Sequence, residues 1–196
     1  MPKAGNNPVN KRDTLLLAIG AVAVYLWSKS TSGVKMAPSK ILTFVTSAVN
    51  GARTASAEYN LPIWLFLTAG AHESGMGLSK LAQDGFNFFG ITADNPKDPW
   101  NVAGKPRVFY ETKEWIGGKP TVVKRYFRKY ASPADSFRDY GRLLTSNARY
   151  AKAVAAAREG DVVGTFKALG ASGYATDPTY GTKLAGVYSS VKDFIA

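Results

Sequence analysis

Apolar residues recur every three to four positions in the first globular part of the chain. Over residues 39–59 this spacing predicts an amphipathic helix. The next run, residues 61–71, is apolar on nearly all sides, which predicts a helix buried in the core. We expect Asn60 to cap this second helix, with Pro62 in its first turn.

The pattern becomes strand-like in the middle of the chain. Two β-like runs, residues 107–115 and 120–128, are joined through Gly117–Gly118, which suits a hairpin. A short helix over residues 79–83 is expected before them, ending near Gly85.

Three further helices are predicted after the hairpin, each with a start signal. The signals are Ser132-Pro133, Asp161 and Asp177-Pro178. Gly170 is expected to close the helix that Asp161 opens. Helices on both sides of a small hairpin lobe predict an α+β fold, mainly helical, with a cleft between the lobes.

The N-terminal segment has a different character. Residues 14–27 run for 14 positions without a charge, after a polar stretch that carries Lys11 and Arg12. We interpret this run as an uncleaved signal-anchor helix in the membrane, while a cleaved signal or a buried amphipathic helix remains open. The expected organisation is a polar tail (1–13), a hydrophobic helix (14–27), a linker (28–38) and a globular domain (39–196).

Composition excludes several kinds of active site. The chain has no cysteine and one histidine, His72, so a Cys nucleophile is excluded, and we expect neither a zinc centre nor any other cofactor. A Ser–His–Asp triad would have to be built on His72, with Ser74 nearby in sequence.

The net charge of +11 points to an anionic partner, either a nucleic acid, a membrane surface or an acidic polymer. The densest basic cluster comprises Lys119, Lys124, Arg125, Arg128 and Lys129, interleaved with Tyr126, Phe127 and Tyr130. Such a mixture can bind single-stranded nucleic acid. On a strand, however, aromatic residues usually pack into the core, and no nucleic-acid partner is expected.

Glu73 is the main candidate for catalysis. It follows the apolar run at the point where the sequence turns to Ser74-Gly75-Met76-Gly77. A carboxyl group at the end of a buried helix is partly desolvated, which raises its pKa and suits a general acid. The alternative is an exposed glutamate at a helix end with a glycine cap.

Several motifs resemble glycoside hydrolase family 73, the glucosaminidases of bacterial autolysins, flagellar-rod proteins and phage. The matching segments are Ala71–Gly77, Asn87–Ile91, Thr112–Lys119, Phe127–Tyr130 with Ser136, Asp139 and Tyr140, then Asn147, Arg149, Tyr150 and Gly173–Tyr180. Met76 and Phe88 depart from the usual Trp and Leu, but both stay apolar.

The resemblance implies a lysozyme-like fold and cleavage of the β-1,4 bond after N-acetylglucosamine in peptidoglycan. Glu73 would then be the general acid and Glu114 the second carboxylate, with Glu111 as its rival. On a strand these two point to opposite faces, so only one should reach the cleft. In a substrate-assisted route the 2-acetamido group attacks instead, and Glu114 or Tyr174 would only orient or stabilise.

Sugar binding would give some aromatic residues a function. The candidates for stacking on sugar rings are Phe89, Trp115, Tyr150 and Tyr174. Rival functions are a lytic transglycosylase or muramidase, a non-catalytic wall-binding protein and, from charge alone, a nucleic-acid binder. The protein is expected either in a membrane, facing the cell wall or periplasm, or in a phage virion.

Overall fold

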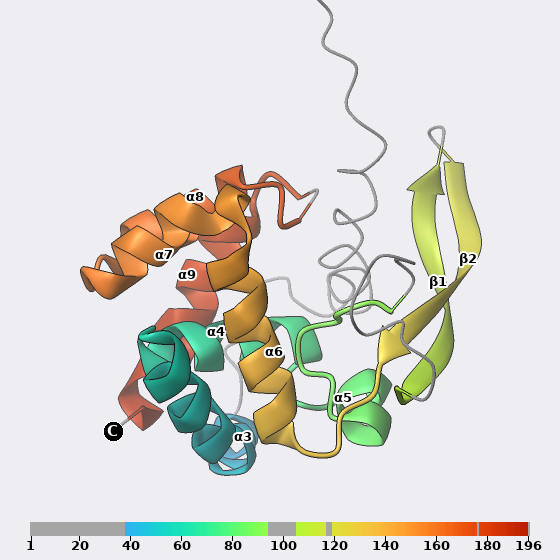
Figure 1. Cartoon of the computed structure of the whole chain (residues 1–196), viewed down its shortest axis with the longest axis horizontal. Coiled ribbons are helices and arrows are strands. Elements are labelled where there is room, and N and C mark those ends of the chain that lie inside the picture. Colours follow the sequence, from blue (N-terminus) through green and yellow to red (C-terminus); the bar gives the residue numbers. More distant parts are fainter. Residues whose placement is uncertain (1–37, 94–104, 117–118, 176, 196) are drawn as a thin grey trace, which may run out of the picture.

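The computed structural model describes residues 38–93, 105–116, 119–175 and 177–195. Over these residues the chain is mainly helical with one two-stranded antiparallel sheet, which confirms the expected mixture of helices and a hairpin (Figure 1). The hydrophobic segment 14–27 lies outside the described residues. None of the helices described is long and apolar enough to cross a membrane, and the anchor at 14–27 stays a prediction.

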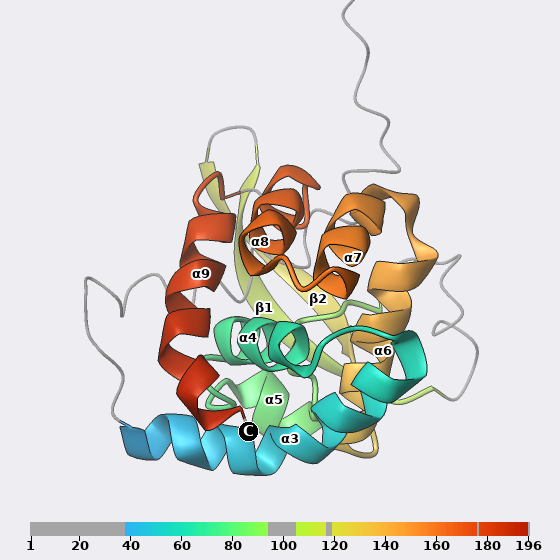
Figure 2. The ribbon, with the colours of Figure 1, turned by 90° about the vertical axis from the view of Figure 1, so that its left-hand side faces the viewer.

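Helix α4 (Ile63–Ser74) is the centre of the molecule. Every residue from Leu65 to Ser74 is buried, as its apolar sequence predicts. Helices α3 (Pro38–Tyr59) and α9 (Tyr180–Val191) pack against it, and Figure 2 shows α4 with other helices on several sides. The end of α4 is therefore held inside the helical body.

Asn60 does not cap α4, contrary to the sequence prediction. It has a positive φ of 51° and ends α3, where the Leu61 amide donates to the Ser56 carbonyl at 3.3 Å. Asparagine tolerates this left-handed conformation, so it closes one helix and does not start the next. Pro62 precedes α4, in the cap position, with no side-chain cap bond.

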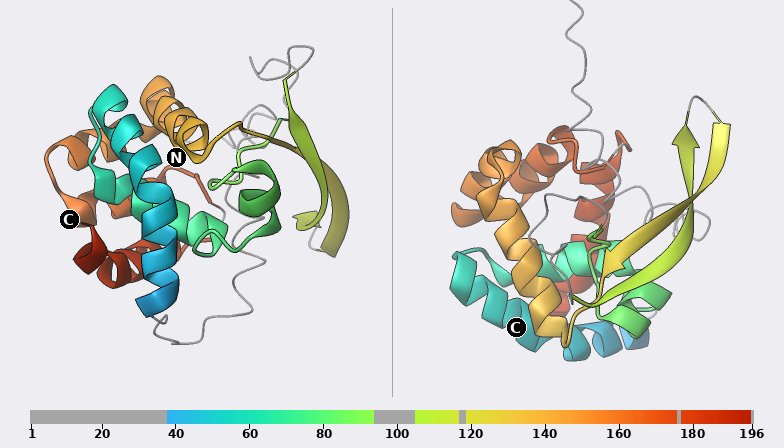
Figure 3. Two further views of the ribbon diagram at one scale, coloured as in Figure 1. Left: turned by 90° about the horizontal axis from the view of Figure 1, so that it is seen from below. Right: turned by 45° about the vertical axis from the view of Figure 1, so that its right-hand side comes forward.

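The hairpin stands to one side of the helical body (Figure 3). Strands β1 (Arg107–Ile116) and β2 (Lys119–Arg128) pair along their full length, from Arg107 opposite Arg128 to Ile116 opposite Lys119. The predicted runs are confirmed to within one residue, while the Gly117–Gly118 turn lies outside the described residues. Before the hairpin, α5 (Lys80–Gly85) begins at Ser79, whose side chain accepts from the Ala82 amide.

The helices after the hairpin begin at two of the predicted signals. Ser132 accepts from the Asp135 amide at the start of α6 (Pro133–Ser146), and Asp161 accepts from the Gly164 amide at the start of α8 (Val162–Ala171). Gly170 does not end α8 but lies within it. The remaining elements are η2 (Ala148–Tyr150), α7 (Ala151–Arg158), which the sequence did not predict, and η3 (Lys192–Phe194) after α9.

Candidate active site

Glu73 is placed by the way α4 ends. Gly75 follows the helix with a φ of 58°, and the Met76 amide donates to the Ala71 carbonyl at 2.8 Å, which closes the last turn. Glycine adopts this left-handed conformation without steric cost. The cap keeps Glu73 on the final helical turn, where the negative end of the helix dipole further disfavours a carboxylate.

The Glu73 carboxyl group is buried and hydrogen-bonded on one side only. The residue is 4% exposed, and the Tyr180 hydroxyl donates to Oε1 at 2.7 Å. Oε2 has no hydrogen-bond partner among the residues described. Burial raises the pKa of Glu73 to about 8, against a smaller lowering by the Tyr180 hydrogen bond. The carboxyl group is therefore mostly protonated at neutral pH, and the exposed-glutamate alternative is wrong.

Tyrosine rings surround this carboxyl group. Tyr180 stacks on Tyr174 with ring centroids 5.4 Å apart, and Tyr140 meets Tyr174 edge-on at 6.1 Å. Burial, followed by the nearby charge of Glu73, raises the pKa of Tyr140, Tyr174 and Tyr180 well above the ordinary value. These phenols stay protonated, so they are neutral hydroxyl groups around a neutral acid.

Three of the four proposed sugar-stacking residues lie in this core. Phe89, Tyr150 and Tyr174 are each 0% exposed. Phe89 stacks on Tyr140 at 4.1 Å with nearly parallel rings, and Tyr150 contacts Tyr174. All three side chains are fully buried and contact other aromatic residues, which argues against direct sugar stacking. The sequence pattern had no signal to separate a core aromatic residue from an exposed one.

Both candidates for a second carboxylate, Glu111 and Glu114, belong to strand β1. Glu111 is exposed and lies opposite Lys124, on the face of the sheet that carries Phe109. Because alternate residues of a strand belong to opposite faces, position 114 falls on the same face of β1 as Tyr110. Tyr110 is on the face that contacts α5, where its hydroxyl donates to Asp84 at 2.9 Å. The side chains of Glu114 and Trp115 lie outside the described part of the structure.

His72 and Ser74 do not form a catalytic pair. The Ser74 hydroxyl donates to the Gly70 carbonyl of its own helix and accepts from the Gly77 amide. His72 is buried, which lowers its pKa to about 4, with a further lowering by Lys183. In the described parts of the chain, no three His, Cys, Asp or Glu side chains gather closely enough to hold a metal ion.

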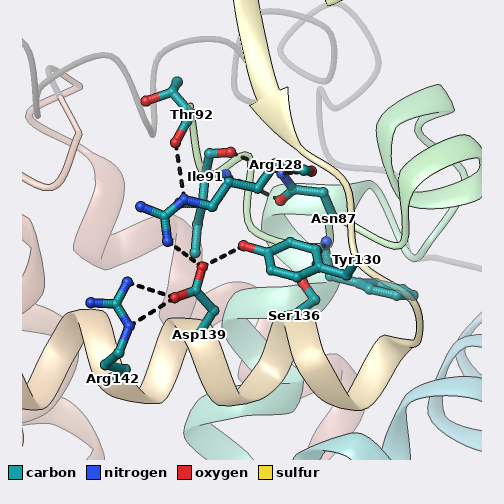
Figure 4. Close-up of polar contacts among 9 residues, drawn as sticks. Asn87, Ile91, Thr92, Arg128, Tyr130, Ser136, Asp139 and Arg142 are labelled. Carbon is teal, nitrogen blue, oxygen red and sulfur yellow. Dashed lines mark hydrogen bonds and ion pairs between the residues drawn. The ribbon is translucent and has the colours of Figure 1, made fainter. Parts of the chain in front are cut away.

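A buried polar network attaches the hairpin to the helical body. Figure 4 shows Asp139 of α6 between Arg128, at the end of β2, Tyr130 and Arg142. Arg128 is 3% exposed and pairs with Asp139 at 2.5 Å, while its Nε donates to the Thr92 carbonyl at 3.1 Å. Burial is the largest single effect on the pKa of Asp139 and raises it, but Arg128, Tyr130 and Arg142 together outweigh it, and the net shift is downward.

Asn87 connects this network to the loop after α5. Its amide group donates to the carbonyls of Ile91 and Arg128, each at 2.9 Å, and its oxygen accepts from the Ile91 amide. The Phe88 amide donates to Ser136 of α6 at 3.1 Å. The motif residues Asn87, Ser136 and Asp139 therefore hold the hairpin base, and Met76 and Phe88 fill the core as expected.

The basic and aromatic cluster of the hairpin is divided between core and surface. Phe127 and Tyr130 are buried, as expected for aromatic residues on a packed strand, whereas Tyr126 is 43% exposed. Arg128 is a buried structural cation and not a surface charge. Sequence reasoning missed two features of the site, the Arg128–Asp139 pair and the contact of Tyr180 with Glu73.

Known proteins resemble this chain over most of the described region. The family model of mannosyl-glycoprotein endo-beta-N-acetylglucosaminidase matches residues 49–193. The peptidoglycan hydrolase FlgJ of Salmonella typhimurium is 35% identical over 147 residues, 72% of this chain and 43% of FlgJ. The exo-glucosaminidase LytG of Bacillus subtilis is 30% identical over 148 residues, 74% of this chain and 49% of LytG. The chain thus spans about half the length of these relatives.

Solved structures match the same region. A peptidoglycan hydrolase mutant from Sphingomonas sp. A1 has a TM-score of 0.64 and 32% identity, covering 78% of this chain and 96% of that one. The truncated glycoside hydrolase domain of Salmonella typhimurium FlgJ has a TM-score of 0.61 and 33% identity, covering 78% and 98%. From the family match over most of its length and the shared fold, the chain belongs to the glucosaminidase family of glycoside hydrolases.

Proposed function

We propose that the protein hydrolyses the glycan strands of peptidoglycan at the β-1,4 bond on the reducing side of N-acetylglucosamine. The observation that carries this proposal is the Glu73 carboxyl group, buried at the end of α4 with its pKa raised to about 8. A neutral carboxylic acid at pH 7 is what a general acid in glycoside hydrolysis requires. The glucosaminidase and peptidoglycan hydrolase relatives support the choice of polymer.

In this mechanism Glu73 protonates the departing sugar oxygen. Oε1 is occupied by Tyr180, so Oε2 is the oxygen that delivers the proton. Oε2 is buried, so a glycan oxygen can reach it only after the surrounding residues move. Binding of the glycan has to supply the free energy for that movement.

The second half of the reaction has two routes. Glu114 can activate water, or the 2-acetamido oxygen of the substrate can attack its own anomeric carbon. We favour Glu114 over Glu111 for the first route. Glu111 is exposed on the face of the hairpin opposite to the one that contacts α5, and it lies opposite Lys124.

The test is digestion of purified peptidoglycan with the full chain and with Glu73→Gln. Gln keeps the shape of Glu73 but has no proton to donate, so wall hydrolysis should fall at least 100-fold. The matched control is Glu159→Gln, an exposed residue after α7, which should keep full activity. Mass spectrometry of the wild-type digest should show new N-acetylglucosamine reducing ends.

One other reaction fits a single acid. Glu73 is a carboxyl group with a pKa raised to about 8, and a lytic transglycosylase also needs only one acid. Anhydromuramic ends in the digest would assign that reaction, and muramic acid reducing ends would assign a muramidase. Full activity of Glu73→Gln would remove Glu73 as the acid, and a wild-type protein that binds the wall without cutting it would be a binding protein.

A further inference from the structure

The hydroxyl group of Tyr180 contacts the carboxyl group of Glu73 across 107 positions of sequence. Building on the proposed function, we propose that Tyr180 is a positioning residue for the acid. Its hydroxyl holds Oε1 as the acceptor, so that the proton of the neutral acid is carried by Oε2. Nothing in the sequence pattern separates Tyr180 from the other buried residues of α9.

In the structure the Tyr180 hydroxyl is the donor in this contact and Oε1 of Glu73 is the acceptor. Burial raises the pKa of Tyr180 well above the ordinary value, so the phenol keeps the proton with which it forms this hydrogen bond. A neutral carboxylic acid has one carbonyl oxygen, which accepts, and one hydroxyl oxygen, which donates. With Oε1 accepting from Tyr180 at 2.7 Å, the remaining proton belongs on Oε2, which has no partner among the described residues.

Packing holds the Tyr180 ring in place from several sides. The ring stacks on Tyr174 at 5.4 Å and meets the His72 ring edge-on, also at 5.4 Å. The next residue, Gly181, lies so close to α8 that an added Cβ would be 2.6 Å from the Phe166 carbonyl oxygen. The start of α9 therefore cannot shift without disturbing α8, and the hydroxyl stays aimed at Glu73.

The other titratable groups near Glu73 are neutral at working pH. Tyr140 from α6 and Tyr174 from the segment after α8 are phenols whose pKa burial raises. His72, the neighbour on α4, has its pKa lowered to about 4 by burial, then by Lys183, against an opposing effect of Asp177. The hydrogen bond of Tyr180 is thus the specific contact that acts on the acid.

The first test compares pH–rate profiles of the wild type and Tyr180→Phe, which keeps the ring and removes the hydroxyl. The hydrogen bond lowers the pKa of Glu73, so its loss should move the alkaline limb to higher pH. The kcat at optimal pH should fall roughly tenfold, the worth of one such bond, with KM nearly unchanged because Tyr180 is buried. Tyr188→Phe, a partly buried tyrosine of α9 that packs on Trp64, should match the wild type.

The second test measures the titration of the Glu73 carboxyl carbon by NMR in both proteins without substrate, using Glu73→Gln to assign the signal. The NMR titration does not depend on wall hydrolysis. It therefore separates failure of this inference from failure of the proposed function. A higher Glu73 pKa in Tyr180→Phe, together with the lower kcat, supports the inference. An unchanged Glu73 titration, or an unchanged kcat in a folded variant, overturns it.

Discussion

Two neighbouring residues at the end of α4 both lose their charge for the same physical reason. Burial raises the pKa of Glu73 to about 8 and lowers that of His72 to about 4, because desolvation disfavours the charged form of each. The burial of Glu73 was predictable from sequence, because the apolar run before it and the capping glycine after it are local signals. Tyr180 was not, because its contact with Glu73 depends on how α9 docks on α4.

These shifts predict how stability depends on pH. Between the unfolded pKa of 4.5 and the folded value of about 8, the native state keeps a proton on Glu73 that the unfolded chain loses, so stability falls as pH rises. His72 acts in the opposite direction between about 4 and 6.5, where stability rises with pH. The two effects offset each other up to about pH 6.5, and above it the effect of Glu73 remains.

We therefore expect the free energy of unfolding to decline between about pH 6.5 and about pH 8, by up to about 1.4 kcal/mol per pH unit. Glu73→Gln has no proton to lose and should lack this decline. Urea denaturation of both proteins across this range measures the difference. Parallel curves for the two proteins would contradict the shift.

At the scale of elements, the close contact between α8 and α9 determines where Tyr180 lies. Gly170 lies inside α8, where an added Cβ would be 3.2 Å from the Gly181 amide nitrogen, and Gly181 in turn lies against the Phe166 carbonyl. This explains why Gly170 did not end the helix as expected from its sequence. A glycine after an apolar run fits a cap or a close helix contact equally well, and only the tertiary structure distinguishes them.

Gly181→Ala should be destabilising because the new methyl group meets backbone atoms, which cannot rotate away. The expected loss is about 1–3 kcal/mol, with a fall in activity as Tyr180 shifts. Gly186→Ala, in the same helix with nothing within 4 Å of its added Cβ, should instead stabilise by about 0.5–1 kcal/mol. Thermal denaturation of both variants checks this, and equal effects would disprove the close-contact explanation.

At the scale of the whole molecule, the hairpin is attached to the helical body by a buried ion pair. The sequence predicted both strands within one residue, because alternation and glycines are local signals. It did not predict the ion pair between Arg128 on β2 and Asp139 on α6, because the two residues meet only after the chain has folded. This ion pair helps to set the position of the strand that carries Glu114 relative to the helices that carry Glu73.

Asp139→Ala leaves Arg128 buried without its carboxylate, which should cost about 3–5 kcal/mol of stability. Amide exchange should quicken first at the hairpin base, where the Arg128 amide donates to Ile91. Glu58→Gln, which breaks the exposed Arg138–Glu58 pair, should change stability by less than about 1 kcal/mol. If the two variants lost similar stability, the buried Arg128–Asp139 pair would not be what attaches the hairpin to the helical body.

The most direct measurement is the titration of the Glu73 carboxyl carbon by NMR in the wild-type full chain. The signal is identified by its absence from Glu73→Gln. The structure predicts an apparent pKa near 8, with the group still mostly protonated at neutral pH. A value near the ordinary 4.5 would mean that Glu73 is ionised at working pH and cannot be the proton donor.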